Sequence, residues 1–268
     1  MKSAKPKLIN PTVILWLAIL VPFVTVLGAS FQYGESFGPL GWGATFLFQL
    51  FIVFMAFTPL HESAHGIASR NKRLNEGMLL SCSLFFLADT GLFRALHVTH
   101  HAKTNMGEED PDHFTSAPTL AGRWIRSFAL IAYYHLFAWK RFRRTHRAIF
   151  YRSFPSLLYP FALLAVSASN GHLTWALLAW VIPSITAAGL LSFVNTAWPH
   201  DVGGEVSRFK NTRIHQLPGW AQALMCNQNL HLVHHMQPTL PWWKYPEVWS
   251  ANREKWTSQG AAVFDYRR

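Results

Sequence analysis

Histidine is the residue type whose spacing in this sequence points to chemistry. Eight of the fourteen histidines fall in three clusters, and residues three or four positions apart share one face of a helix, so the rings of each cluster are expected to face one point. Imidazole binds iron, zinc and copper. Eight imidazoles exceed the four ligands of a zinc ion, so we predict a site for two metals with positions left open for O2. The clusters are His61-Glu-Ser-Ala-His65, His97-Val-Thr-His100-His101 and His231-Leu-Val-His234-His235.

Several residues near the clusters are candidates to complete the site. His200 follows the last apolar stretch and is expected to be a further metal ligand. Metal-bound histidines usually donate their second N–H to a carboxylate or carbonyl, so nearby acidic residues are expected to orient ligand rings, with helix capping as the alternative. No catalytic side chain beyond the metal ligands is expected. The candidates for these supporting contacts are Asn195, Asp89, Asp110, Asp112, His113 and Asp201.

Four apolar stretches are long enough to cross a bilayer, which needs about 20 mostly apolar residues. They run over Pro11–Phe31, Leu40–Leu60, Phe154–Ser169 and Leu173–Trp198. Two weaker stretches, Met78–Leu96 and Phe128–Trp139, are expected to be re-entrant or interfacial helices because irregular polar backbone cannot face lipid. We therefore predict an all-α integral membrane protein with four transmembrane helices, interfacial helices and a cytosolic histidine-rich cap, in a single domain over residues 1–268.

The basic residues predict the orientation. All 24 Lys and Arg residues lie before Pro11, between residues 61 and 154, or after Trp198, and the loops near 28–39 and 169–171 have none. By the positive-inside rule, both termini and the active site are expected on the cytoplasmic side, in the inner (plasma) membrane if the chain is bacterial. Membrane lipids then account for the net charge of +11, and no nucleic-acid partner is expected. The basic cluster between Lys140 and Arg147 predicts a headgroup anchor, with a dock for an acidic electron carrier as the alternative.

Two other classes of protein share part of this pattern. The first cluster reads HExxH, the signature of zinc metalloproteases, in which Glu62 would be the general base. Such a site has no use for two HxxHH clusters. A metal storage or transport protein would need more polar residues within its spans than this sequence has. Both remain remote alternatives to an oxidoreductase.

With these three clusters the chain resembles the membrane fatty acid desaturase and hydroxylase superfamily, from about Leu40 to Trp249. Segments beyond the clusters are most similar to carotenoid ring hydroxylases of the beta-carotene hydroxylase type, and next to carotenoid ketolases. These segments are Glu109-Asp-Pro-Asp-His-Phe114, Pro199-His200, Arg208-Phe-Lys-Asn-Thr-Arg213 and the run from Gln228 to Tyr245. Glu62 stands where the family often has Asp, and Met236-Gln237 stand where Leu-Trp is expected.

The resemblance implies a non-haem di-iron oxidoreductase that uses O2 on a lipophilic substrate. A carotenoid ring hydroxylase is the expected activity, and a fatty acyl-lipid desaturase or hydroxylase is the alternative. The chain shows no haem-binding segment and no cysteine quartet for an iron–sulfur cluster, so an external electron donor such as a ferredoxin or a cytochrome is expected.

Overall fold

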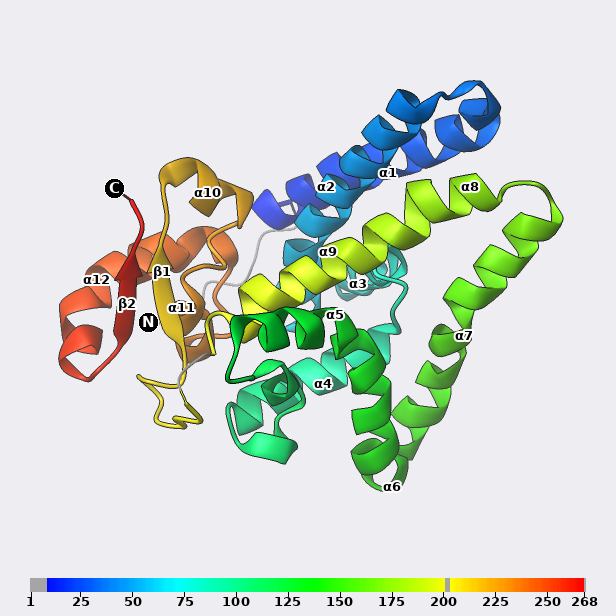
Figure 1. Cartoon of the computed structure of the whole chain (residues 1–268). Helices are drawn as coiled ribbons and strands as arrows, with labels where there is room; N and C mark the ends of the chain where they lie inside the picture. Colours follow the sequence, from blue (N-terminus) through cyan, green and yellow to red (C-terminus); the bar gives the residue numbers. More distant parts are fainter. Residues whose placement is uncertain (1–8, 201–202, 268) are drawn as a thin grey trace.

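Two long helical hairpins dominate the computed structural model, which describes residues 9–200 and 203–267. α1 (Pro11–Tyr33) and α2 (Pro39–Ala64) form the first hairpin. α7 (Arg147–Ser169) forms the second with a continuous run of α8 (Leu173–Trp175), α9 (Ile182–Ser192) and two π-helical turns, Ala176–Val181 and Phe193–Ala197. These helices are the four in the described residues that are long and apolar enough to cross a membrane, as the sequence predicts. Both hairpin turns lie on one side of the molecule, away from the C-terminal segment (Figure 1).

The spanning helices begin where the sequence supplies start signals. Asn10 accepts hydrogen bonds from the backbone N–H groups of Thr12 and Val13, and Pro11 occupies the first helical position. Pro39 likewise occupies the first helical position of α2. α7 begins seven residues earlier than the apolar stretch indicates, because residues 147–153, which include Arg147 and Arg152, are helical as well. The N-terminal lysines Lys2, Lys5 and Lys7 lie outside the described residues.

The segment between the hairpins contains shorter helices. α3 (Lys72–Phe85) and α4 (Thr90–Lys103) meet at a bend of 97°. Two 3-10 turns, Gly107–Glu109 and Pro111–Thr115, then lead to α5 (Leu120–Phe137), which continues through a π-helical turn (Ala138–Phe142) into α6 (Arg143–Thr145). A bent pair fits the re-entrant or interfacial helix predicted near Met78–Leu96. The second weak stretch, Phe128–Trp139, lies in α5 and the π-helical turn that continues it.

The C-terminal segment folds over one end of the hairpins. It contains β1 (Arg213–Gln216), α10 (Gly219–Leu224), α11 (His231–Met236), α12 (Tyr245–Ser258) and β2 (Ala262–Asp265). The two strands pair in parallel, with Arg213 opposite Ala262, so the described chain is mostly helical rather than purely α. Its core holds Ile214, Leu232, Tyr245 and other buried apolar residues. This small core fixes α11, the helix that carries the third histidine cluster.

α2 is the central helix of the bundle, and α1, α3 and α9 pack around it. Their shared core includes Phe23, Val53, Phe85 and Leu191. α5 packs against α9 at Gly189, where an added Cβ atom would lie 2.5 Å from the ring of Phe128. A side chain larger than hydrogen at this position would therefore force the ring of Phe128 to move.

Candidate metal centre

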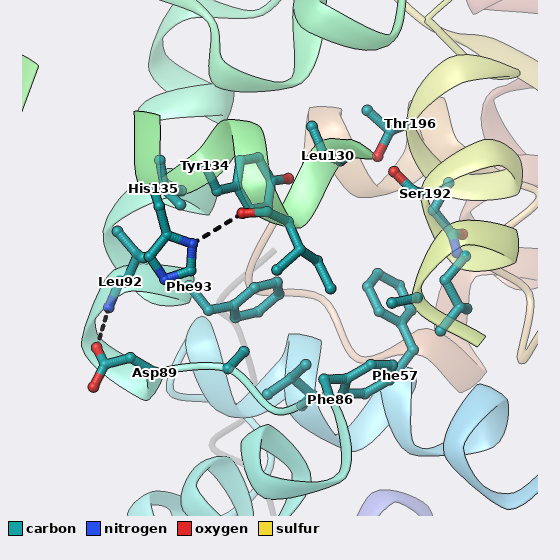
Figure 2. A pocket seen from close by; sticks show the side chains of 17 residues that line it. Phe57, Phe86, Asp89, Leu92, Phe93, Leu130, Tyr134, His135, Ser192 and Thr196 are labelled. Atoms are coloured by element: carbon teal, nitrogen blue, oxygen red, sulfur yellow. Dashed lines mark hydrogen bonds between the residues drawn. The ribbon is translucent and has the colours of Figure 1, made fainter. Parts of the chain in front are cut away.

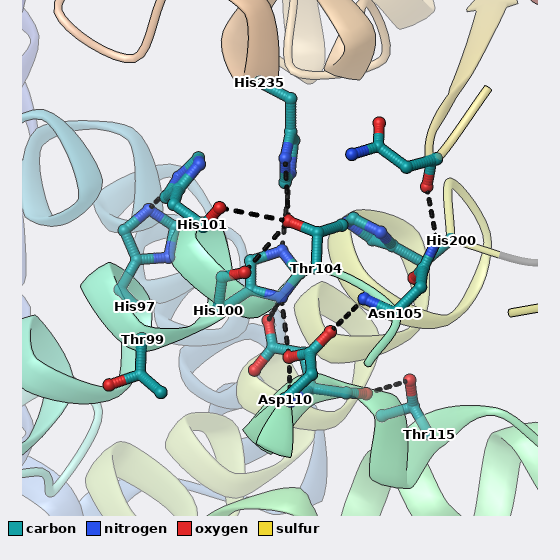
Figure 3. Close-up of polar contacts among 12 residues, drawn as sticks. His97, Thr99, His100, His101, Thr104, Asn105, Asp110, Thr115, His200 and His235 are labelled. Atoms are coloured by element: carbon teal, nitrogen blue, oxygen red, sulfur yellow. Dashed lines mark hydrogen bonds and ion pairs between the residues drawn. The ribbon is translucent and has the colours of Figure 1, made fainter. Parts of the chain in front are cut away.

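The three histidine clusters converge at the end of the bundle beneath the C-terminal segment. His61 and His65 lie at the end of α2, the second cluster lies on α4 and the third on α11. His200 follows the last spanning helix and joins them. Figure 3 shows His200 and His235 around His100, with His97 and His101 beside them. The structure thus brings all nine predicted ligand residues together.

The nine imidazoles form two separate groups. Within each group the ring nitrogens that could bind a metal all lie within 4.8 Å of one another. The first group has five members and the second has four. The first contains His61, His65, His97, His101 and His234, and the second contains His100, His200, His231 and His235.

Each HxxHH cluster divides between the two groups, which corrects the expectation that its three rings face one point. On α4, His97 and His101 belong to the first group and His100 belongs to the second. On α11 the assignment is reversed, because His234 alone belongs to the first group. In a helix with 3.6 residues per turn, positions three and four residues on project to opposite sides of the starting residue. An adjacent pair of histidines can therefore serve two metals.

The spacing of the ring nitrogens fits a shared cation in each group. The Nε2 atoms of His65 and His97 lie 2.8 Å apart, and those of His200 and His231 lie 3.0 Å apart. Two nitrogens about 2.1 Å from one metal on perpendicular axes would be about 3 Å apart. A neutral imidazole has one N–H donor and one acceptor nitrogen. When the acceptor nitrogens of four or five rings face one point, the rings cannot satisfy one another by hydrogen bonds. The donor set therefore matches a pair of imidazole-rich metal sites and is consistent with a di-iron centre.

Burial keeps several of the ligand rings neutral. His100 differs, because the carboxylates of Asp110 and Asp112 outweigh desolvation and raise its pKa to about 9. Desolvation lowers the pKa of His65 to about 4 and, together with the nearby His100, lowers the pKa of His231 to about 3. Desolvation and neighbouring imidazoles also hold the pKa of His200 and His235 well below the usual range. These rings are therefore neutral at physiological pH, as metal binding requires.

Two of the predicted carboxylates lie against a histidine. Asp110 Oδ1 is 2.8 Å from Nδ1 of His100, and Asp112 Oδ2 is 3.6 Å from the same atom. Asp110 also accepts backbone N–H groups from Asn105 and Asp112, which fix its orientation (Figure 3). The contact between Asp110 and Nδ1 of His100 leaves Nε2 of that ring facing the four-histidine group. It is the geometry expected of a carboxylate that orients a ligand ring.

Three further contacts were missed by the sequence analysis. The hydroxyl of Tyr134 on α5 donates to Asp112 at 2.6 Å. The hydroxyl of Tyr245 lies 3.1 Å from Nδ1 of His234, and the hydroxyl of Thr104 lies 3.4 Å from Nδ1 of His235. These partners come from distant segments or lie beside a cluster as ordinary hydroxyl residues, so no spacing rule identifies them.

Other predicted residues do not approach the histidine groups in this way. Asp89 caps α4 by accepting the backbone N–H of Leu92 at 2.7 Å, which is the capping alternative. His113 lies in a 3-10 turn and belongs to neither group. Asn195 is buried, and its side-chain oxygen has no hydrogen-bond partner among the described residues. Asp201 lies outside the described residues.

Glu62 does not face the histidine groups, contrary to the metalloprotease reading of HExxH. One of its carboxylate oxygens accepts the hydroxyl of Thr12, and the other accepts the backbone N–H of Trp242. The side chain is fully buried. Both oxygens are thus engaged in joining segments, and neither is free to act as a general base at a metal-bound water.

An apolar cavity of about 100 Å³ lies beside the first histidine group. Its wall includes Leu60 and Leu96, the residues immediately before His61 and His97. The rings of Phe57 and Phe93, which also line it, stack against those same two histidines at centroid distances of 5.4 and 5.7 Å. Figure 2 shows Asp89 and His135 at one end of this cavity and Ser192 and Thr196 at the other. The lining of this space is apolar, as is typical of sites that bind apolar ligands.

Comparison with known proteins places these features in context. Residues 37–267 match the model of a family described as fatty acid desaturase. The zeaxanthin 4-ketolase of Chlamydomonas reinhardtii is 27% identical over 86% of this chain and 52% of its own length. The beta-carotene ketolase of a Paracoccus strain is 24% identical over 87% of both chains. A chloroplastic omega-6 fatty acid desaturase of Brassica napus is 26% identical over 73% of this chain and 50% of its own length. The chain therefore spans about half the length of the algal and plant relatives.

Proposed function

Because the chain belongs to the fatty acid desaturase family of oxidoreductases, we propose that it is a di-iron, O2-dependent enzyme that oxidises a ring carbon of a carotenoid. The observation that carries this proposal is an apolar cavity whose lining residues Phe57 and Phe93 stack on histidines of one of the two imidazole groups. Four apolar helices indicate a multi-pass membrane protein, in which a lipophilic substrate is dissolved in the surrounding bilayer.

The two histidine groups would hold one iron each. His61, His65, His97, His101 and His234 would bind the first, and His100, His200, His231 and His235 the second. When bound, such a pair supplies the reduction of O2 to an oxidant strong enough to remove hydrogen from an unactivated C–H bond. The orienting contact of Asp110 on His100 and the contact of Tyr245 with His234 keep the rings aimed at these positions.

The remaining residues of the cavity act by position. Phe57 and Phe93 line the cavity as an apolar wall and stack on His61 and His97, so this wall would set how closely the C–H bonds of a bound molecule approach the five-histidine group. The same wall excludes water, which protects a reactive site from side reactions. The choice between a hydroxyl, a keto group and a double bond depends on which C–H bond this wall brings closest.

The ketolase relatives favour a carotenoid substrate, and they are similar to this chain over 86–87% of its length. Hydroxylation of the ring, the activity expected from the sequence, and ketolation are successive oxidations of the same kind of carbon. The plant omega-6 desaturases support an acyl lipid as the second candidate. Electrons would come from a separate protein, a ferredoxin or a cytochrome. The distribution of Lys and Arg would place the histidine groups on the cytoplasmic side.

Expression in bacterial cells that accumulate beta-carotene tests this function. Extracted pigments and fatty acids are separated and identified, with a His234→Ala variant as the control. Hydroxylated or keto carotenoids that the control lacks would support the proposal and identify the reaction. Unchanged carotene with new unsaturated or hydroxylated fatty acids would replace it with the acyl-lipid function. No new product in either pool, in cells that co-express a ferredoxin and its reductase, would contradict both.

A further inference from the structure

A second hollow lies on the outer side of the bend between α3 and α4. It runs between this bend and α7, and its wall includes Leu80, Leu84, Leu158 and Tyr159. We call it the outer groove and the cavity beside the histidines the inner cavity. Ala88 and Asp89, which form the bend itself, line both.

A side-chain contact also links the wall of the inner cavity to the wall of the outer groove. His135 of α5 lines the inner cavity, and Ser156 of α7 lines the outer groove. Nε2 of His135 lies 3.4 Å from the hydroxyl oxygen of Ser156. Figure 2 shows His135 at the same end of the inner cavity as Asp89. The inner cavity and the outer groove are therefore neighbours, separated by Ala88 and Asp89 of the bend and by this histidine–serine pair.

The outer groove faces the region that lipid would occupy. The side chains of Leu80, Leu84 and Leu158 are 56%, 44% and 55% exposed, and Leu158 belongs to a helix that can span a membrane. Exposed leucines on α3 and on the spanning helix α7 are stable against acyl chains. A molecule dissolved in the bilayer would reach this groove without passing through water.

The backbone at the junction is irregular. Four residues separate α3 from α4, and Leu87 has a φ angle of +54°, in the left-handed region that a leucine rarely adopts. Non-helical backbone at membrane depth is found where it lines a cavity or is buried in protein. Asp89 accepts one N–H of α4 here, and its neighbour at position 88 is a small alanine.

We propose that the outer groove is the lateral entrance through which a long apolar molecule passes from the bilayer into the inner cavity. Ala88 and Asp89 form one side of the doorway, and His135 and Ser156 form the other. The inference rests on the proposed function for the identity of the natural substrate, but the entrance itself would admit any slender apolar chain.

Photolabelling of protein in lipid nanodiscs tests the entrance directly. The probe is an octadecyl chain that carries a terminal diazirine, and labelled residues are identified by mass spectrometry. In the unaltered protein we expect adducts both in the outer groove, at Leu84 or Leu158, and in the inner cavity, at Phe93 or Leu130. In Ala88→Trp the groove adducts should remain and the cavity adducts should be lost.

Two further variants make the result decisive. Ser156→Trp narrows the doorway from α7 and should give the same loss of cavity adducts, so the test does not depend on one substitution. Phe161→Trp is the matched control, because Phe161 is 66% exposed on the same helix and lies outside the wall of the groove. It should leave both sets of adducts unchanged. Iron content and gel-filtration profile check that each variant is folded.

The possible outcomes separate the entrance from the function. Cavity adducts that persist in both doorway variants would overturn the proposal, as would groove adducts without cavity adducts in the unaltered protein. Labelling that follows the expected pattern, in a protein that converts neither carotenoids nor acyl lipids, would support the entrance while contradicting the proposed function.

Discussion

The carboxylate of Glu62 accepts a hydrogen bond from the backbone N–H of Trp242 at 2.6 Å, although 180 residues separate the two in the chain. Glu62 lies between the two histidines of the first cluster, and Trp242 follows the third cluster. The other carboxylate oxygen accepts the hydroxyl of Thr12 at the start of α1. One buried side chain thus holds the first spanning helix and the C-terminal segment in register with the metal ligands.

Replacing Glu62 is expected to lower the free energy of unfolding, and the loss should grow with the number of hydrogen bonds removed. Glu62→Ala leaves the hydroxyl of Thr12 and the N–H of Trp242 without their partner, which costs about 1–3 kcal/mol for each buried group. Glu62→Gln keeps an oxygen that can accept the N–H of Trp242 and should cost less. Thermal unfolding in detergent and iron content after purification measure both effects.

The same pair of variants separates this role from that of a general base. In a metalloprotease the glutamine variant would lose activity as completely as the alanine variant. Here we expect Glu62→Gln to retain most of its iron and turnover. Loss of turnover in Glu62→Gln at full iron content and unchanged stability would show that the carboxylate takes part in the reaction.

Removing the carboxylate that orients His100 should weaken one metal site. Asp110→Asn is expected to lower the iron affinity of the four-histidine group about 10–100-fold, the usual cost of losing such a partner. Tyr134→Phe removes the hydroxyl that donates to Asp112 and should have a smaller effect of about 1 kcal/mol. Titration with Fe(II), followed by Mössbauer spectroscopy, reports the two sites separately.

Tyr133 supplies the matched control for this prediction. It neighbours Tyr134 on α5, but its ring stacks on Phe114 at a centroid distance of 4.0 Å. Tyr133→Phe keeps this stacking and should leave the Fe(II) titration unchanged. Equal effects of the two substitutions would mean that Tyr134 contributes general packing rather than support for His100.

The close approach of α5 and α9 depends on Gly189. Gly189→Val forces the ring of Phe128 to move and is expected to cost about 1–3 kcal/mol, the usual range for overpacking a core. The double variant with Phe128→Ala should recover part of this loss. Gly43→Ala is the control, since a Cβ at that position meets no atom within 4 Å. The fraction of monodisperse protein that remains after heating is the measurement, and equal losses for Gly189→Val and Gly43→Ala would contradict the argument.

The sequence predicts the parts of this molecule that depend on local pattern. Apolar length is a property of each segment, so the four spans could be located, and the i, i+3 and i, i+4 spacings indicated which histidines share a helix. The convergence of the clusters followed from the hairpin topology. His200 could be included because it follows a span at the same depth as the clusters.

Features that depend on tertiary geometry could not be predicted in this way. Which histidine of each HxxHH cluster joins which group depends on how α4 and α11 are rotated about their axes, and no spacing rule contains that rotation. Tyr134 and Tyr245 reach the site from distant segments and are ordinary aromatic residues in the sequence. Asp89 interrupts an apolar stretch, which suggested a role at the metal, but it caps α4 instead.

Iron stoichiometry in ligand variants tests the central claim most directly, because the claim is that the nine histidines form two separate iron sites. Protein reconstituted with Fe(II) without oxygen should contain two irons per chain. His200→Ala, which removes a ligand from the four-histidine group, should lower this value toward one and leave the Mössbauer signal of the other site in place. His113→Ala should retain both irons, since His113 belongs to neither group. A single metal per chain in the unaltered protein, or equal loss of both irons in His200→Ala, would contradict the account.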